Sequence, residues 1–240
     1  MIDGETMRSV RELRARGLSP KEIARSLGVR PAVVGDLVRT LAAERGAAAP
    51  DGDLVGCWVS AGWSAGLSIA GPPQWRDPGG DDGTCGLVSA VVARRRRSRR
   101  TVAVCVYLVD VYCLGVKNAM GPDGMDDQAL RRLTRCVFSG YCAPPVPAPI
   151  ELVRDLVLGA AEYARGLGFA AHRDFEQARA HLGPWIGPGA VTFGCDGKPT
   201  YVEGPYDDSA QVLRTLRGAV GRDGFHHTVT LDVEELPLTG

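Results

Sequence analysis

The 240-residue sequence lacks the segments that mark membrane and exported proteins. No apolar run approaches the ~18–20 residues that a membrane-spanning helix requires. The first residues, MIDGETMRSV, contain no apolar stretch of the kind found in a signal peptide. These absences predict a cytoplasmic protein that does not bind a membrane. Hydrophobic residues still make up 45% of the chain, which is enough to build a folded core.

The cysteine and histidine residues indicate neither a disulfide framework nor a metal site. The seven cysteines are odd in number, and no two have the C-x-x-C spacing of zinc ribbons and fingers. His226 and His227 are adjacent, so in a strand their side chains would point to opposite faces and would not share a metal easily. The glycine-rich segments also lack the lysine of a phosphate-binding loop. We therefore predict free thiols, no metal and no cofactor.

The most informative pattern lies in residues 19–39, SPKEIARSLGVRPAVVGDLVR, which are typical of a helix-turn-helix. Ala24 is a small residue that would let two helices approach closely. Gly28, four positions later, would supply the unusual backbone of the tight turn. Val34 and Leu37 recur at helical spacing and would pack the second helix onto the first.

Capping residues mark the helix starts in this segment. Ser19 is a favourable N-cap, Pro20 suits the first helical position, and Glu22 completes a Ser-x-x-Glu capping box. Pro31 has the same role at the start of the second helix. A further helix is expected over residues 5–16, which would complete a three-helix unit.

The chain is predicted to contain two domains of unequal size. Small residues followed by Pro and Gly predict a linker over residues 47–53, between a helix-turn-helix domain (1–46) and a larger domain (54–240). The larger domain mixes strands and helices without regular βαβ alternation, which indicates an α+β fold. Residues 1–45 hold nine basic and six acidic side chains, while the whole chain is neutral. A modestly basic head on an acidic body is compatible with DNA binding.

In a typical helix-turn-helix, outward residues of the second helix contact base edges in the major groove. The candidate DNA-binding residues are Arg25, Arg30, Ala32, Val33, Asp36 and Arg39. The three arginines would hold phosphates, whereas the second helix has no Asn or Gln to read adenine. Two interpretations remain: a binder of double-stranded DNA with modest specificity, or a protein-contact module that uses the small face around Ala32, Val33 and Gly35.

Two apolar, β-branched runs at residues 87–93 and 101–112 predict a hairpin with a basic turn. The basic residues are Arg94, Arg95, Arg96, Arg97, Arg99 and Arg100. They would either grip nucleic-acid phosphates or form a solvated end that discourages pairing between sheets.

The remaining elements of the larger domain follow from apolar periodicity and turn residues. Helices are predicted over residues 127–138, 150–166, 174–182 and 208–220. Strands at 190–194 and 199–203 would pair across the turn dipeptide Asp196-Gly197, and a last strand would cover 225–231. Loops are expected at residues 72–83 and 121–127, and a proline-rich break at 144–149.

Polar and nucleophilic residues gather where the strand over residues 101–112 ends. They are Asp110, Cys113, Lys117 and Asn118. If Cys113 were a nucleophile, His172 would be its candidate base. Asp174 or Glu162 would then orient the imidazole. The alternative is a structural cysteine beside polar residues at a strand end.

The N-terminal segment resembles the helix-turn-helix domains of bacterial regulators, sigma factors and recombinases, in which LSPKEIARSLGV is a familiar phrase. The rest resembles an uncharacterised domain that follows such heads in actinobacterial proteins. The phrases that carry this second resemblance are YLVDVYCLGVKNA, LVLGAAEYARGLGFAAHRDF and FGCDGKPTYVEGPYDD. The first resemblance implies a fold but does not identify a DNA target. The second implies neither an activity nor a catalytic residue.

These observations together predict a DNA-binding regulatory protein whose larger domain senses a ligand, self-associates or binds a partner. A homodimer is expected, because such proteins commonly bind two half-sites of DNA. An enzyme built around Asp110, Cys113, Lys117 and His172, and an adaptor whose head contacts protein, are the alternatives.

Overall fold

The computed structural model describes residues 20–30, 34, 52–72, 75, 77–79, 83–95, 101–185 and 189–229. The chain divides into two compact units, Met1–Ala49 and Pro50–Gly240. This division falls within the linker predicted over residues 47–53, and the first strand of the larger unit begins at Asp53. Each unit is described by itself.

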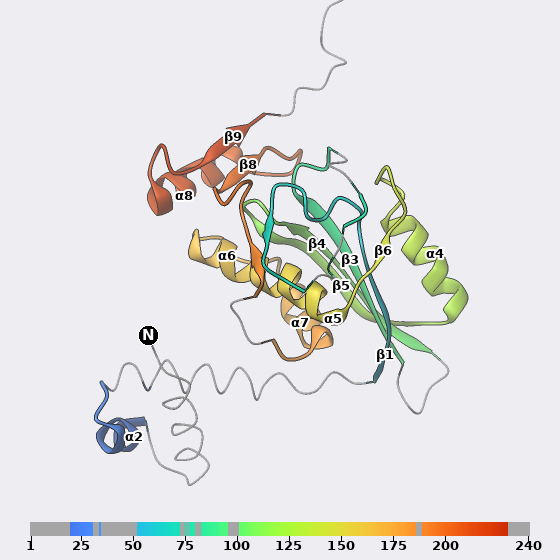
Figure 1. The fold of residues 1–240 in the computed structure, drawn as a ribbon, viewed down its shortest axis with the longest axis horizontal. Helices are drawn as coiled ribbons and strands as arrows, with labels where there is room; N and C mark the ends of the chain where they lie inside the picture. Colours follow the sequence, from blue (N-terminus) through green and yellow to red (C-terminus); the bar gives the residue numbers. More distant parts are fainter. Residues whose placement is uncertain are drawn as a thin grey trace, which may run out of the picture. The chain divides into compact units, whose positions relative to one another are not determined.

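A five-stranded antiparallel sheet forms the centre of the larger unit (Figure 1). Its strands are β1 (Asp53–Val59), β3 (Leu87–Arg95), β4 (Val102–Asp110), β5 (Gly115–Met125) and β6 (Val146–Pro147), in the order β5–β4–β3–β1–β6. The predicted hairpin is confirmed as β3 and β4, which pair from Leu87↔Asp110 to Arg95↔Val102. Seven consecutive residues of β3 are buried, because both faces of the sheet are covered.

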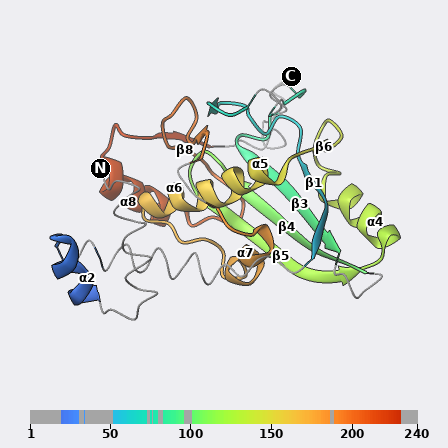
Figure 2. The same cartoon turned by 60° about the horizontal axis from the view of Figure 1, so that its bottom comes forward.

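One face of the sheet packs against a helical layer, seen from two directions in Figures 1 and 2. This layer contains α5 (Ile150–Arg154), the π-helical turn η1 (Asp155–Gly159), α6 (Ala160–Gly166) and α7 (Phe175–Leu182). The opposite face carries α4 (Asp127–Val137), whose Leu130 packs with Phe138 on Val91 and Val104. Helices thus lie on both faces of this antiparallel sheet, which confirms the predicted α+β class for the larger unit.

The helix predicted over residues 150–166 is present, with a π-helical turn in its middle. Asp155 begins this turn and is buried, and its two carboxylate oxygens accept hydrogen bonds from Trp185 Nε1 (2.6 Å) and Ala190 N (2.7 Å). A Cβ on Gly189 would overlap the same carboxylate. Asp155 therefore links Trp185 and Ala190, which follow α7, to the helical layer through hydrogen bonds.

Two small sheets complete the larger unit. β2 (Ser68–Ile69) pairs with β7 (Val191–Thr192), and β8 (Thr200–Val202) pairs in parallel with β9 (His226–Thr228), beside α8 (Ser209–Val220). The helices predicted over 127–138, 174–182 and 208–220 are confirmed as α4, α7 and α8.

Three sequence predictions about strand pairing and loops are wrong. The strands near residues 190–194 and 199–203 do not pair with each other beyond one bridge, Cys195↔Lys198, because each finds a distant partner instead. Residues 121–125 of the loop expected at 121–127 belong to β5, which continues to Met125 along β4 through irregular register. The proline-rich break at 144–149 contains β6, a two-residue edge strand.

The core position Leu156 tests the packing of this helical layer. Leu156 is fully buried, so Leu156→Ala is expected to lower the free energy of unfolding by about 2–5 kcal/mol through lost contacts and a cavity. The matched control is Leu54→Ala, at a side chain that is 42% exposed, with an expected change within about 0.5 kcal/mol. Urea unfolding of the full chain measures both. Equal effects of the two substitutions would contradict the described packing.

Candidate functional site

Part of the segment that resembles a helix-turn-helix is described in the smaller unit. Helix α2 (Pro20–Leu27) ends where Gly28 adopts a left-handed φ of +65°. The backbone N–H of Val29 donates to the carbonyl of Ala24 (3.1 Å), which closes the end of the helix. Gly28 thus has the backbone conformation expected of the turn glycine.

Burial separates the inner from the outer residues of this segment. Ile23, Ala24 and Val34 are buried, with exposed fractions of 0%, 3% and 0%. Arg25 and Arg30 are exposed. Several predicted residues of the segment lie outside the described part of the chain: Ser19, Pro31, Ala32, Val33, Gly35, Asp36, Leu37 and Arg39.

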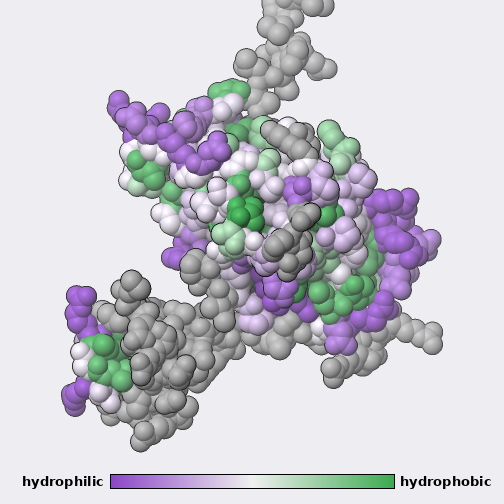
Figure 3. Space-filling view, in the orientation of Figure 1, coloured by the Kyte–Doolittle hydropathy of each residue, from purple (hydrophilic) through white to green (hydrophobic). Residues whose placement is uncertain are grey.

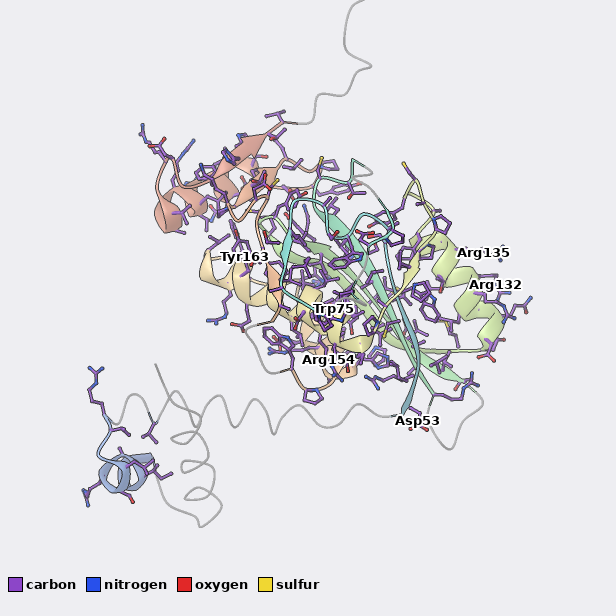
Figure 4. The ribbon with its side chains drawn as sticks, in the orientation of Figure 1. Asp53, Trp75, Arg132, Arg135, Arg154 and Tyr163 are labelled. Carbon is purple, nitrogen blue, oxygen red and sulfur yellow. The ribbon has the colours of Figure 1, made fainter. Side chains whose placement is uncertain are left out.

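Arg94 does not belong to an exposed basic turn, contrary to its place in the predicted arginine cluster. It lies within β3 and is 6% exposed. Its Nε donates to the carbonyl of His181 (2.8 Å), and Arg154, labelled in Figure 4, donates through Nε to the carbonyl of Leu182 (2.9 Å). Burial lowers the pKa of Arg94, and the neighbouring Arg154 lowers it further. Both arginines therefore cap the C-terminal end of α7.

The other arginines of the predicted cluster divide into two groups. Arg95 forms an ion pair with Asp127 at the start of α4 (2.7 Å) and keeps 41% of its side chain exposed. Arg96, Arg97, Arg99 and Arg100 lie outside the described residues.

Asp110 ends β4 and holds the turn into β5. Its carboxylate accepts hydrogen bonds from the backbone N–H groups of Tyr112 (2.9 Å), Cys113 (3.0 Å) and Leu114 (3.1 Å). Burial raises the pKa of Asp110 to about 6, although these three donors and Lys117 act in the opposite direction. Asp110 therefore stabilises a turn.

The structure does not assemble Cys113 and His172 into a nucleophile and its base. Cys113 is 0% exposed, and burial raises the pKa of its thiol far above the ordinary value, with a further increase from Asp110. His172 accepts a hydrogen bond at Nδ1 from the backbone N–H of Asp174 (3.3 Å), and the Asp174 carboxylate lies 3.8 Å from the same nitrogen. Glu162 pairs instead with Arg165. Within the described residues, no hydrogen bond joins Cys113 to His172.

Lys117 belongs to a polar network that connects β5 to the C-terminal part of the larger unit. Its Nζ contacts both carboxylate oxygens of Asp207 (2.8 and 2.9 Å). Tyr201, which is fully buried, lies 3.0 Å through its hydroxyl from Ser209 Oγ, and Ser209 donates to Glu203. The sequence pattern at the end of the strand includes Lys117 but not its partners, because they follow it by more than eighty positions. Asn118, the remaining candidate, is exposed on β5.

The raised pKa of Asp110 has a measurable consequence for stability. A carboxyl group whose pKa is higher in the folded state than in the unfolded state stabilises the fold at low pH and loses that contribution as pH rises. Between pH 4 and pH 7, the unfolding free energy of the wild type relative to Asp110→Asn should therefore fall by about 2 kcal/mol. Urea unfolding at both pH values measures this difference. A difference that is independent of pH would contradict the burial of an ionisable carboxyl group at this position.

The role of Arg94 can be separated from that of an exposed arginine. Arg94→Gln should lower the free energy of unfolding by about 1–3 kcal/mol, because the carbonyl of His181 loses the hydrogen bond from Arg94 Nε. Arg95→Gln is the neighbouring control and should cost less than about 1 kcal/mol, since its ion pair is exposed. Thermal unfolding followed by circular dichroism compares the two. Similar losses of stability in the two variants would contradict the burial of Arg94.

Comparison of the chain with protein-family models, with curated proteins and with solved structures finds no match in any of the three. Among the described residues, no group of three or more His, Cys, Asp or Glu side chains could hold a metal ion. No helix in the described ranges has both the length and the apolar character needed to cross a bilayer.

Proposed function

We propose that the protein binds double-stranded DNA through an N-terminal three-helix helix-turn-helix domain and acts as a regulatory protein. The observation that carries this proposal is the geometry at the end of α2. A helix ends there at a left-handed Gly28, and the residues on both sides of the turn, Ala24 and Val34, are buried.

This geometry supports a helix-turn-helix because each residue meets a separate physical requirement of the motif. Two helices joined by a tight turn approach each other closely, which requires a small side chain such as Ala24. The change of direction requires a positive φ, which Gly28 adopts without a steric penalty. Ile23 and Val34 are fully buried and would supply the apolar contact between the two helices.

The exposed charges of the same segment support DNA as the ligand. Arg25 and Arg30 are exposed, and among the described residues neither takes part in an ion pair. Guanidinium groups in such positions bind phosphate oxygens, which fixes a protein on the duplex without reading its sequence. The larger unit would then contribute self-association, ligand sensing or partner binding. Because Cys113 is buried and its thiol pKa is raised, an enzyme built around it is the weaker candidate.

Binding to a labelled duplex of mixed sequence, measured by fluorescence anisotropy across a salt series, tests the proposal. The full chain should bind with a log affinity that falls linearly with log salt concentration. The double variant Arg25→Ala/Arg30→Ala should bind more weakly at low salt. It should also reduce the slope by about 2, because each lost phosphate contact removes about 0.9.

The matched control is Arg214→Ala/Arg222→Ala, which removes two exposed arginines from the larger unit. It should leave both affinity and slope unchanged. If the control weakened binding as much as the Arg25/Arg30 variant, the attraction would be one of overall charge and not of the helix-turn-helix. Failure of the full chain to bind even at about 50 mM salt would overturn DNA binding and favour a protein-contact role for the head.

A further inference from the structure

The face of the sheet that carries α4 is hollowed beside that helix. The groove has a volume of about 670 Å³, which is within the range of about 300–1,000 Å³ typical of small-molecule sites. Its apolar part is formed by Trp58 of β1, Leu130 of α4, and Phe138 and Pro145, which follow α4. Figure 3 shows hydrophilic surface over α4 beside hydrophobic atoms.

The indole of Trp58 lines this groove and lies over Gly56, which has no side chain and precedes it by two residues on β1. Gly56 and Trp58 are two residues apart and so lie on the same face of β1. A Cβ on Gly56 would come within 2.9 Å of Trp58 Cη2, so the ring covers the backbone of Gly56. Trp58 is only partly buried, and it packs at the edge of the cluster formed by Val91, Val104 and Leu130.

Three arginines of α4 also line the groove, and Figure 4 labels two of them, Arg132 and Arg135. The third is Arg131, one helical turn before Arg135. All three are exposed. None of the ion pairs between described residues involves them. Their charge is therefore not neutralised by a neighbouring carboxylate within the described part of the chain.

The acidic residues of the same helix are already engaged at its N-terminal end. Asp126 accepts a hydrogen bond from the backbone N–H of Ala129 (2.7 Å), and Asp127 pairs with Arg95 (2.7 Å). The sequence of α4, DQALRRLTRCV, contains no other carboxylate. An apolar floor thus borders a helix face whose arginines form no ion pair with another described residue.

We propose that this groove binds an organic carboxylate whose apolar body is the size of a small aromatic ring system. The body would lie on the partly buried ring of Trp58, with the buried Phe138 at the floor of the groove. The carboxylate would be held by the guanidinium groups of Arg131 and Arg135, which lie on one face of α4 at i, i+4 spacing and can bind a carboxylate through two parallel hydrogen bonds. The site belongs to the larger unit alone and does not depend on DNA binding by the head.

Isothermal titration of the full chain with 2-naphthoate, uncharged 2-naphthalenemethanol and acetate tests this proposal. The naphthoate should bind at least about tenfold more tightly than either of the others, because only it combines an apolar body with a charge-assisted hydrogen bond. Trp58→Leu should weaken the binding of both naphthalene compounds, with circular dichroism confirming that the variant is folded.

The double variant Arg131→Gln/Arg135→Gln should lose about tenfold or more in affinity for naphthoate and keep its affinity for naphthalenemethanol. Arg214→Gln/Arg217→Gln on α8 removes the same charge from another exposed helix face and should leave both affinities unchanged. Three results would each overturn the proposal: no saturable binding of naphthoate, naphthoate binding no tighter than the alcohol, or equal losses in the two double variants. Loss of duplex DNA binding in the α4 variant, without naphthoate binding by the wild type, would assign the arginines to nucleic acid instead.

Discussion

Burial of the β3–β4 hairpin on both faces is the constraint around which the larger unit is arranged. Seven consecutive residues of β3, 88–94, are buried, so the sheet needs an apolar layer on each side. The segments from α5 to α7 supply one complete layer. On the other face the structure describes one helix, α4, which is 11 residues long, and the groove beside Trp58 lies next to this helix.

The same constraint determines what the buried polar residues do. A buried polar group is costly unless it has a hydrogen-bond partner, and most of the partners of the buried charged residues Arg94, Asp110 and Asp155 are backbone groups. Arg94 contacts carbonyls at the end of α7, Asp110 contacts three N–H groups of a turn, and Asp155 holds Trp185 and Ala190. Residue types that also serve catalysis and phosphate binding therefore connect distant segments of this fold.

The two proposals assign different chemistry to the two units. The smaller unit carries exposed arginines on either side of the left-handed turn at Gly28. The larger unit carries an apolar groove bordered by arginines of α4 that form no ion pair with another described residue. If both sites are occupied in one molecule, any coupling between them is reciprocal: a carboxylate that changes DNA affinity must have its own affinity changed by DNA to the same extent. The network of Lys117, Asp207 and Tyr201 ties the C-terminal part of the larger unit to the sheet that also supports this groove.

The sequence by itself determined those features that depend on neighbours within a few residues. Helices α4, α7 and α8, the β3–β4 hairpin and the left-handed turn at Gly28 all follow from periodicity, capping and glycine placement, since these act over one or two turns of chain. Only the tertiary structure decided which strands pair across long separations, as β2 does with β7. It also decided that Arg94 is buried while Arg95 keeps 41% of its side chain exposed, and that the uncharged floor at Trp58 meets the arginines of α4. The reason is physical: partner choice and burial depend on which surfaces meet when the chain closes, and the local pattern of residues does not contain that information.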